Sequence, residues 1–185
     1  MGAPKANLQF RGEPLLPSVV AALGRAAAPV LVVLDAIQVL KYAIPDDVVI
    51  VRDRTQDAGP VAGLVAGLNA CSSELVVAVG CDMPFLDPLL LRWLVAQAEG
   101  ADAVIPVVDE RPQYLHAIYR VSARGAIDRL LEGGARSLRA IAAGLETRYV
   151  TPPAGSNRSF TNVNTPAELR RAEQLERAEL ADPTL

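Results

Sequence analysis

Three short apolar runs lie in the first half of the chain, at residues 30–34, 48–51 and 75–79. Each run is rich in β-branched residues and is continuous, without the alternating polar positions of a strand that has one wet face. This pattern is typical of parallel strands that are covered on both faces. Longer stretches separate the runs, and we predict helices over residues 15–27, 60–70 and 87–99.

The second half of the chain continues the alternation of strands and helices. We predict strands at residues 103–106, 115–120 and 147–150, and helices near residues 123–132 and 137–143. A loop over residues 151–159 precedes a final helix. Thr165 can cap that helix, Pro166 suits its first position, and Glu168 completes a capping box. The order of elements predicts an α/β fold with a mostly parallel sheet and helices on both faces.

Length and composition narrow the class of protein. The 185 residues predict one domain over residues 1–185, and a hydrophobic content of 51% excludes a disordered chain. A net charge of −3 and an aromatic content of 4% argue against nucleic-acid binding. The sequence has no apolar run of membrane-spanning length and no signal peptide, so we expect no membrane contact. Cys71 and Cys81 form no CxxC pair, which predicts reduced thiols in a cytoplasmic protein.

Ligands of open α/β sheets bind outside the carboxyl ends of the strands, so the residues that follow each run are candidate site residues. Gly80, Cys81 and Asp82 follow the run at residues 75–79. A carboxylate in this place is a natural ligand for Mg²⁺, which also takes phosphate oxygens and water. From position alone, Asp82 is equally suited to capping the following turn.

Asp53 follows the run at residues 48–51 and could contact a ligand, although on spacing alone a solvated loop acid is the stronger interpretation. Gly59, Pro60 and Gly63 then open a helix. Free N–H groups at a helix start attract phosphate, and glycine lets a ligand approach closely. Packing of small residues against the sheet explains the same pattern equally well.

Three further positions carry polar chemistry. Lys5 could neutralise a phosphate, but an N-terminal lysine is weak evidence by itself. His116 is the only histidine, and its apolar neighbours favour a hydrogen-bonded structural histidine over a general base. Asn162 and Asn164 share one side of an extended segment; capping explains one of them, and two suggest a ligand.

Five segments in this order resemble the molybdenum cofactor guanylyltransferase family, the MobA-like NTP transferases, which have a Rossmann-like nucleotidyltransferase fold. The segments are MGAPKA from Met1, GPVAG from Gly59, CDMPFL from Cys81, QYLHAIY from Gln113 and FTNVNTP from Phe160. The resemblance covers residues 1–172. The segments at Cys81 and Phe160 are fairly specific to the family, whereas those at Met1 and Gly59 are shared with cytidylyl- and sugar nucleotidyltransferases.

The resemblance implies transfer of GMP from GTP to molybdopterin that carries molybdenum, with release of pyrophosphate. It implies that Lys5 binds the nucleotide phosphates and that Asp82 binds Mg²⁺. It also implies that Asp53 helps to bind the nucleotide and that Asn162 and Asn164 face the active cleft. GTP and molybdopterin would be the substrates of a monomer or weak oligomer, with pterin-delivery proteins and molybdoenzymes as possible partners.

Two departures from the family pattern leave alternatives open. The family has a strand and a glycine-rich phosphate loop, LAGGxSxRMGxxK, and this sequence starts at the methionine of that motif. We expect an internal start or an incomplete sequence; a chain truly lacking this part would leave neighbouring strand edges unpaired and bind GTP weakly. The family often has asparagine where this chain has residues 35–38, Asp-Ala-Ile-Gln. A cytidylyltransferase or another nucleotidyltransferase of this fold, and a truncated non-catalytic binding remnant, are the alternative functions.

Overall fold

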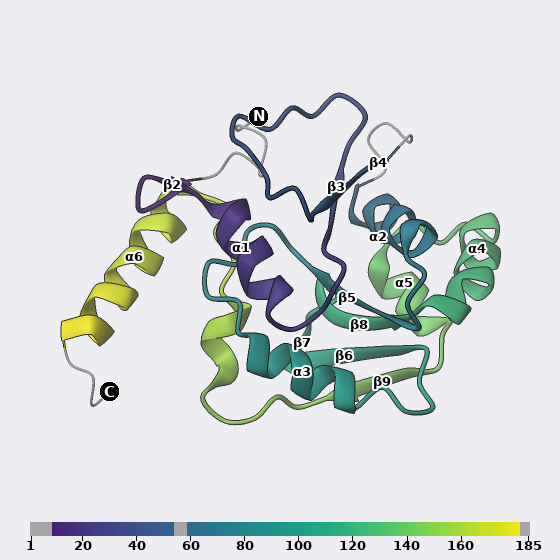
Figure 1. The fold of residues 1–185 in the computed structure, drawn as a ribbon. Coiled ribbons are helices and arrows are strands. Elements are labelled where there is room, and N and C mark those ends of the chain that lie inside the picture. Colours follow the sequence, from purple (N-terminus) through teal and green to yellow (C-terminus); the bar gives the residue numbers. More distant parts are fainter. Residues whose placement is uncertain (1–8, 54–58, 182–185) are drawn as a thin grey trace.

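The computed structural model describes residues 9–53 and 59–181, with the side chains of residues 166, 175 and 177–181 left out. Lys5 therefore lies outside the described residues. The described part is an α/β structure in which helices flank the strands on both sides (Figure 1). Within the described residues, no helix combines the length and the apolar content needed to cross a membrane.

The largest sheet is mixed rather than mostly parallel. Its strand order is β5-β8-β6-β7, and β9 pairs with β6. β8 runs antiparallel to both β5 and β6, whereas β9 runs parallel to β6. The chain returns from β6 to β8 through the short hairpin strand β7, a connection too short for the crossover that a parallel pair needs. The strands are β5 (Leu75–Val79), β6 (Ala103–Val108), β7 (Arg111–Pro112), β8 (His116–Arg120) and β9 (Thr147–Val150).

Two smaller sheets complete the strands. β3 (Leu31–Leu34) and β4 (Val49–Arg52) form a parallel pair, and the hairpin of β1 (Gln9–Phe10) and β2 (Glu13–Pro14) is antiparallel. Among the described strands, β3 pairs with β4 alone and β5 with β8 alone. Each of these two strands therefore has one edge without a strand partner among the described residues.

Helices cover the two faces of the sheet, as predicted (Figure 1). One apolar cluster joins the first and third helices to β3 and to Val104 and Ile118. A second cluster joins three other helices to Ala103, Ile105 and Tyr119, which alternate with the first set along the same strands. The helices are α1 (Leu15–Gly24), α2 (Gly59–Ala70), α3 (Pro88–Ala96), α4 (Arg124–Glu132), α5 (Leu138–Ala143) and α6 (Pro166–Ala181), with short 3₁₀ turns η2 (Val121–Ala123) and η3 (Ser156–Phe160).

Local capping sets several of the helix boundaries. The side chain of Asp87 accepts a hydrogen bond from the Leu89 N–H at the start of α3. At the start of α6, the Glu168 N–H donates to Thr165 Oγ1, and the Thr165 N–H donates to Glu168 Oε2, so the predicted capping box is confirmed. α1 ends at Gly24, three residues before the predicted end, and the N–H groups of Arg25 and Ala26 bond to the carbonyls of Ala22 and Leu23 in a tighter turn.

Arg120 joins the end of β8 to the end of α3. Its Nε donates to the Ala101 carbonyl at 3.0 Å, and another guanidinium nitrogen donates to the Ala98 carbonyl at 2.7 Å. The guanidinium also pairs with Glu74. Arg120 therefore donates hydrogen bonds to two backbone carbonyls in the turn after α3, where no helix or strand supplies the donor.

We expect Arg120→Ala to lower the free energy of unfolding by about 2–3 kcal/mol, because it removes two hydrogen bonds from a charged donor to partly buried carbonyls. Urea unfolding followed by circular dichroism measures this change. Glu74→Gln is the matched control, since the Glu74 side chain is 78% exposed, and it should cost no more than about 0.5 kcal/mol. Equal losses in the two variants would show that the ion pair, not the carbonyl contacts, carries the stabilisation.

Candidate functional site

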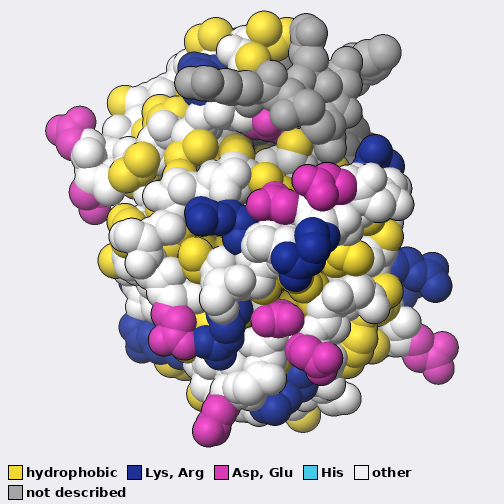
Figure 2. Space-filling model, turned by 90° about the vertical axis from the view of Figure 1, so that its right-hand side faces the viewer, with side chains coloured by type: hydrophobic (Ala, Val, Ile, Leu, Met, Phe, Trp, Pro, Cys, Tyr) yellow, Lys and Arg dark blue, Asp and Glu magenta, His cyan; other side chains and the backbone are white. Residues whose placement is uncertain are grey.

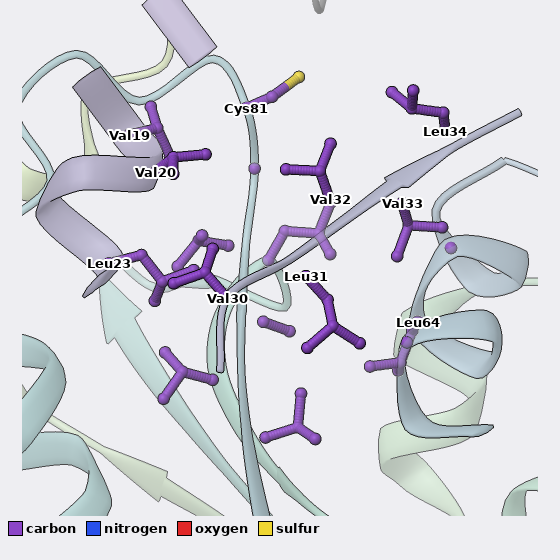
Figure 3. Close-up of a pocket in the computed structure, with 18 of the residues that line it drawn as sticks. Val19, Val20, Leu23, Val30, Leu31, Val32, Val33, Leu34, Leu64 and Cys81 are labelled. Atoms are coloured by element: carbon purple, nitrogen blue, oxygen red, sulfur yellow. The ribbon is translucent and has the colours of Figure 1, made fainter. Parts of the chain in front are cut away.

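Residues that follow the carboxyl ends of β3, β4 and β5 line one cavity. The cavity has a volume of about 800 Å³ and lies between β3 and β5. Asp35, Asp53 and Asp82 line it, each following a different strand. Leu34 and Cys81, next to two of these carboxylates, lie toward the same end of the close-up in Figure 3. The structure therefore brings the predicted residues Asp53 and Asp82 to one cavity, and their role in ligand binding stays a prediction.

Asp82 is the most enclosed of the three carboxylates, with 8% of its surface exposed. A Cβ atom at Gly80 would lie 2.6 Å from Asp82 Oδ1, so a larger residue at position 80 would force this carboxylate to move. The Asp82 carbonyl also accepts a hydrogen bond from the Val163 N–H at 2.8 Å. The loop after β5 therefore holds a buried carboxylate in a place that a Cβ would fill.

Asp53 continues the β3–β4 pairing beyond the end of β4. Its N–H donates to the Leu34 carbonyl at 2.8 Å, and its side chain is half-buried in the cavity lining. Asp53 therefore lines the same cavity as Asp82. Its spacing in the sequence alone had favoured a solvated loop acid over a ligand-binding residue.

Asp35 and Gln38 also line the cavity, and the sequence analysis did not assign them a role. The Asp35 carboxylate accepts a hydrogen bond from the Ile37 N–H at 3.0 Å, which shapes the turn after β3. Arg52 donates to the carbonyls of Asp35 and Gln38 at 3.2 and 2.8 Å and so fastens this turn to β4. The same position rule that selected Asp82, a polar residue directly after a buried strand, could have selected Asp35.

The start of α2 forms another part of the cavity wall. Gly59, Pro60 and Gly63 all line the cavity. Gly59 has a φ of +63°, a conformation that favours glycine, and a Cβ at Gly59 or Gly63 would meet no atom within 4 Å. The open space at Gly63 supports close ligand approach over the alternative of tight packing against the sheet.

Asn162 and Asn164 lie beside the Asp82 loop but not in the cavity lining. Val163 between them is fully buried, whereas both asparagines are exposed. The Asn164 N–H donates to Glu168 Oε2 at 2.8 Å, so position 164 takes part in the helix cap. The structure therefore places both residues near Asp82, through the bond from Val163, without bringing them into the cavity.

His116 is buried, but the predicted hydrogen bond is wrong for the described residues. Neither ring nitrogen has a hydrogen-bond partner there, and the ring packs against Phe160 with centroids 4.3 Å apart. Burial lowers the pKa of His116 to about 4, although the nearby charge of Asp87 acts in the opposite direction. An enclosed imidazole that is neutral at pH 7 and packs on an aromatic ring agrees with the structural role predicted from its apolar neighbours, and that role stays a prediction.

The lowered pKa of His116 predicts a pH dependence of stability. In the unfolded chain the imidazole gains a proton near pH 6.5, whereas the folded chain resists protonation until about pH 4. The unfolded state thus binds more protons in this window, and stability falls as the pH drops from about 6.5 to 4. The maximal contribution is about 3 kcal/mol, from about 1.4 kcal/mol per pKa unit.

His116→Gln removes this titration and should flatten that part of the stability curve relative to the unmodified chain. Urea unfolding at pH 7 and at pH 4.5 measures the difference. Turnover at pH 7 should change only mildly, because His116 is not among the described residues that line the cavity. An unchanged pH dependence, or a large loss of turnover, would contradict the structural role.

Opposite charges are interspersed on the face shown in Figure 2, which is the right-hand side of Figure 1. Cys71 and Cys81 form no disulfide within the described residues, and both are half-buried. Both residues line the cavity.

Comparison with known proteins identifies the family. Residues 1–148 match the family model described as the MobA-like NTP transferase domain. Because this match covers most of the chain, the chain belongs to the MobA-like NTP transferase family. A Cupriavidus metallidurans protein named molybdenum cofactor guanylyltransferase is 34% identical over 188 residues, covering 96% of this chain and 90% of that protein.

Other relatives align over a shorter part of their length. A Cupriavidus necator protein with the same name is 37% identical over 123 residues, covering 63% of this chain and 61% of that protein. A Natronomonas pharaonis relative is 35% identical over 137 residues, covering 66% and 63% of the two chains. The chain thus spans less than two thirds of the length of these two relatives.

Solved structures share the fold. The molybdopterin-guanine dinucleotide biosynthesis protein A of Archaeoglobus fulgidus has a TM-score of 0.73 and 25% identity, over 96% of this chain and 92% of that chain. The 2-C-methyl-D-erythritol 4-phosphate cytidylyltransferase of Thermus thermophilus has the same TM-score of 0.73 at 24% identity, over 95% of both chains. The second likeness concerns the fold alone.

Proposed function

We propose that this protein transfers GMP from GTP to the terminal phosphate of molybdopterin that carries molybdenum, releasing pyrophosphate. The observation that carries the proposal is that Asp53, Asp82 and the start of α2 line one cavity beside the ends of neighbouring strands. The names of the relatives support the choice of guanine nucleotide and molybdopterin as substrates.

Asp82 fits a divalent metal ion, which we propose is Mg²⁺. Its carboxylate is enclosed, and Gly80 leaves the space that the carboxylate occupies. Within residues 9–53 and 59–181, no group of three or more acidic, histidine or cysteine residues could hold a metal ion. A single carboxylate suits Mg²⁺, which takes one or two carboxylates together with phosphate oxygens and water. When bound, the ion would neutralise charge on the transferring phosphates and the leaving pyrophosphate.

The residues of this chain supply positioning rather than covalent chemistry. The N–H groups at the start of α2 would bind phosphate oxygens, and Gly63 would allow their close approach. Asp53 would orient the nucleotide, and Lys5 would neutralise its phosphates. Asn162 and Asn164 would contact substrate from the segment that Val163 ties to Asp82.

The proposed reaction needs in-line attack by a phosphate oxygen on the α-phosphorus of GTP. A phosphate oxygen is already ionised at neutral pH and needs no strong base, which agrees with a buried, neutral His116. Holding the two phosphates in line supplies most of the rate enhancement.

The proposal also includes the domain organisation, the oligomeric state, the location and the partners of the protein. Residues 1–185 would act as one domain, as a monomer or weak oligomer in the cytoplasm. Proteins that deliver the pterin or receive the finished cofactor are the expected partners.

The proposal is tested by incubating the chain with molybdenum-loaded molybdopterin, Mg²⁺ and α-labelled GTP, CTP or ATP in turn. Formation of the labelled dinucleotide and release of pyrophosphate should be at least about tenfold faster with GTP than with CTP or ATP. Faster transfer from CTP would replace the guanylyl assignment with a cytidylyl one. Metal-dependent GTP binding without transfer from any nucleotide would favour the binding remnant.

A further inference from the structure

Apolar side chains are exposed along β4, which has one edge without a strand partner among the described residues. β3 pairs with β4 on one side, and no other described strand pairs with it. Val49 is 48% exposed and Ile50 is 47% exposed, although both lie within the strand. Ile37 and Val39, in the loop that leads into β4, are exposed as well. In the described part of the chain, four of the six exposed large hydrophobic residues therefore gather at this strand and its loop.

The hydrogen bonds between β3 and β4 show which backbone groups face the open edge. The Val49 N–H donates to the Val30 carbonyl at 3.0 Å, so the backbone groups of Val49 face β3. Because successive residues of a strand direct their backbone groups to opposite sides, Ile50 and Arg52 direct theirs away from β3. The open edge therefore presents the N–H and C=O groups of these two residues to another strand.

The exposed side chains of β4 lie on both of its faces. Val48, Ile50 and Arg52 line a pocket of about 460 Å³ on one face. Val49 points to the other face, since neighbouring side chains of a strand alternate. A molecule that rests on one face would cover only one of the two exposed side chains, Val49 or Ile50. A strand added at the open edge covers both, because its own side chains alternate in the same way.

The charges at the two ends of β4 favour a second copy of this chain as the added strand. Asp46 and Asp47 are exposed in the turn before β4, and the exposed Arg52 is its last residue. When two identical strands pair antiparallel about a two-fold axis, the beginning of each lies beside the end of the other. Each arginine then lies beside the carboxylates of the second copy, and this opposite-charge contact occurs twice. A parallel pair would place like charges together.

The side chain of Arg52 is already held on the face of β4 that the pocket occupies. Its Nη1 donates to the carbonyls of Asp35 and Gln38 at 3.2 and 2.8 Å. A guanidinium carries five N–H donors, so it can donate to a carboxylate of a second copy in addition. Since the side chain is held in place by these bonds, little further ordering is needed for the contact.

The side chains select one register for the pair. With Val49 opposite Val49 of the second copy, each Ile50 lies opposite Val48 and each Arg52 lies beside Asp46. The Ile50 N–H would then donate to the Val48 carbonyl of the second copy, because both positions direct their backbone groups to the open edge. A shift of two residues would place Arg52 opposite Val48 and would separate the opposite charges.

We propose that the open edge of β4 is the contact surface of a homodimer, in which two copies of this chain pair antiparallel with Val49 on the two-fold axis. We expect a dissociation constant of about 1–100 μM, because a four-residue edge is a small interface beside those that bury about 1,200–2,000 Å². The inference does not rest on the proposed reaction, because its tests measure mass and cross-linking.

Sedimentation equilibrium of the unmodified chain, from about 1 to about 500 μM, tests the proposal. The mass should rise with concentration from 19.6 kDa toward twice that value. Ile50→Lys should raise the dissociation constant at least about tenfold, because lysine on an edge strand opposes pairing. Leu89→Lys is the matched control, since Leu89 is 69% exposed on α3, and it should leave the constant unchanged. A monomer at every concentration, or a dimer that Ile50→Lys leaves intact, would overturn the proposal.

Asp46→Arg tests the charge contact without changing a residue of the strand. It places an arginine beside Arg52 of the second copy and should raise the dissociation constant at least about fivefold. Asp128→Arg makes the same change of charge at an exposed position of α4 and should leave the constant unchanged. Equal effects of the two variants would show that net charge, rather than this contact, governs association, and would contradict the pairing.

Cysteine cross-linking tests the register. Residues opposite each other in a non-hydrogen-bonded antiparallel pair have Cα atoms about 4.5 Å apart, and a disulfide spans about 4.4–6.8 Å. Oxidation with copper phenanthroline should therefore link Val49→Cys chains into a covalent dimer. Ile50→Cys should link at least about tenfold more slowly, because its cysteines lie diagonally across the axis. The unmodified chain, which contains Cys71 and Cys81, measures the background. Faster linking of Ile50→Cys, or no linking of Val49→Cys above the background, would overturn the proposed pairing.

Discussion

Asp82→Asn is expected to reduce metal-dependent turnover of GTP at least about 100-fold. The substitution keeps the size of the side chain and removes the charge that would hold the metal ion. The hydrogen bond from Val163 goes to the Asp82 carbonyl, which the substitution leaves in place. The fold should therefore survive, and the loss should appear in metal affinity and in turnover together. Titration with Mn²⁺, with the free ion detected by electron paramagnetic resonance, measures the metal affinity directly.

Asp128→Asn is the control for this prediction. Asp128 is exposed on α4 and does not line the cavity, so the same change of charge should leave turnover and Mn²⁺ affinity unchanged. If Asp82→Asn retained normal Mn²⁺ affinity, the metal site would lie elsewhere. A loss of turnover with normal metal affinity would likewise contradict the assigned role.

Gly63→Leu is expected to lower the affinity for GTP at least about tenfold while the chain stays folded. A side chain at this position would extend into the open space of the cavity, where the phosphates are proposed to bind. Leucine is also a better helix former than glycine by up to about 1 kcal/mol, so the midpoint of thermal unfolding should not fall. We therefore expect the GTP affinity to fall while the midpoint of thermal unfolding stays the same or rises. Fluorescent GTP titration and thermal unfolding measure the two quantities.

Gly63→Ala is the matched control, because its single methyl group meets no atom within 4 Å. It should keep most of the GTP affinity and gain a similar helix stabilisation. Normal GTP affinity in Gly63→Leu would show that the nucleotide does not approach the start of α2.

The order of strands and helices followed from local patterns. The apolar run at residues 75–79 became β5, and the capping box at Thr165 and Glu168 began α6. Short elements escaped prediction because two-residue strands such as β1 and β7 carry no periodic signal. Strand direction also escaped, because it depends on the connection between β6 and β8 rather than on the composition of either strand.

The candidate site was predictable to the extent that it follows strand ends. Asp82 and Asp53 were found by their positions after strands, and the same rule applied to Asp35 would have found a third carboxylate. Asn162 and Asn164 share an exposed side of their segment, but no sequence pattern could show that they lie outside the cavity. The contact of His116 with Phe160, which is distant in the sequence, and the missing hydrogen-bond partner of His116 among the described residues were likewise not visible in the sequence pattern.

The central claim is that a nucleotide triphosphate lies at the carboxyl edge of β3, β4 and β5 with a metal ion on Asp82. A crystal structure of the chain with GTP and Mg²⁺ tests it most directly. We predict an Asp82 oxygen about 2.1 Å from the ion and the phosphates beside the start of α2. A metal ion held by other residues, or a nucleotide bound away from this edge, would contradict the account.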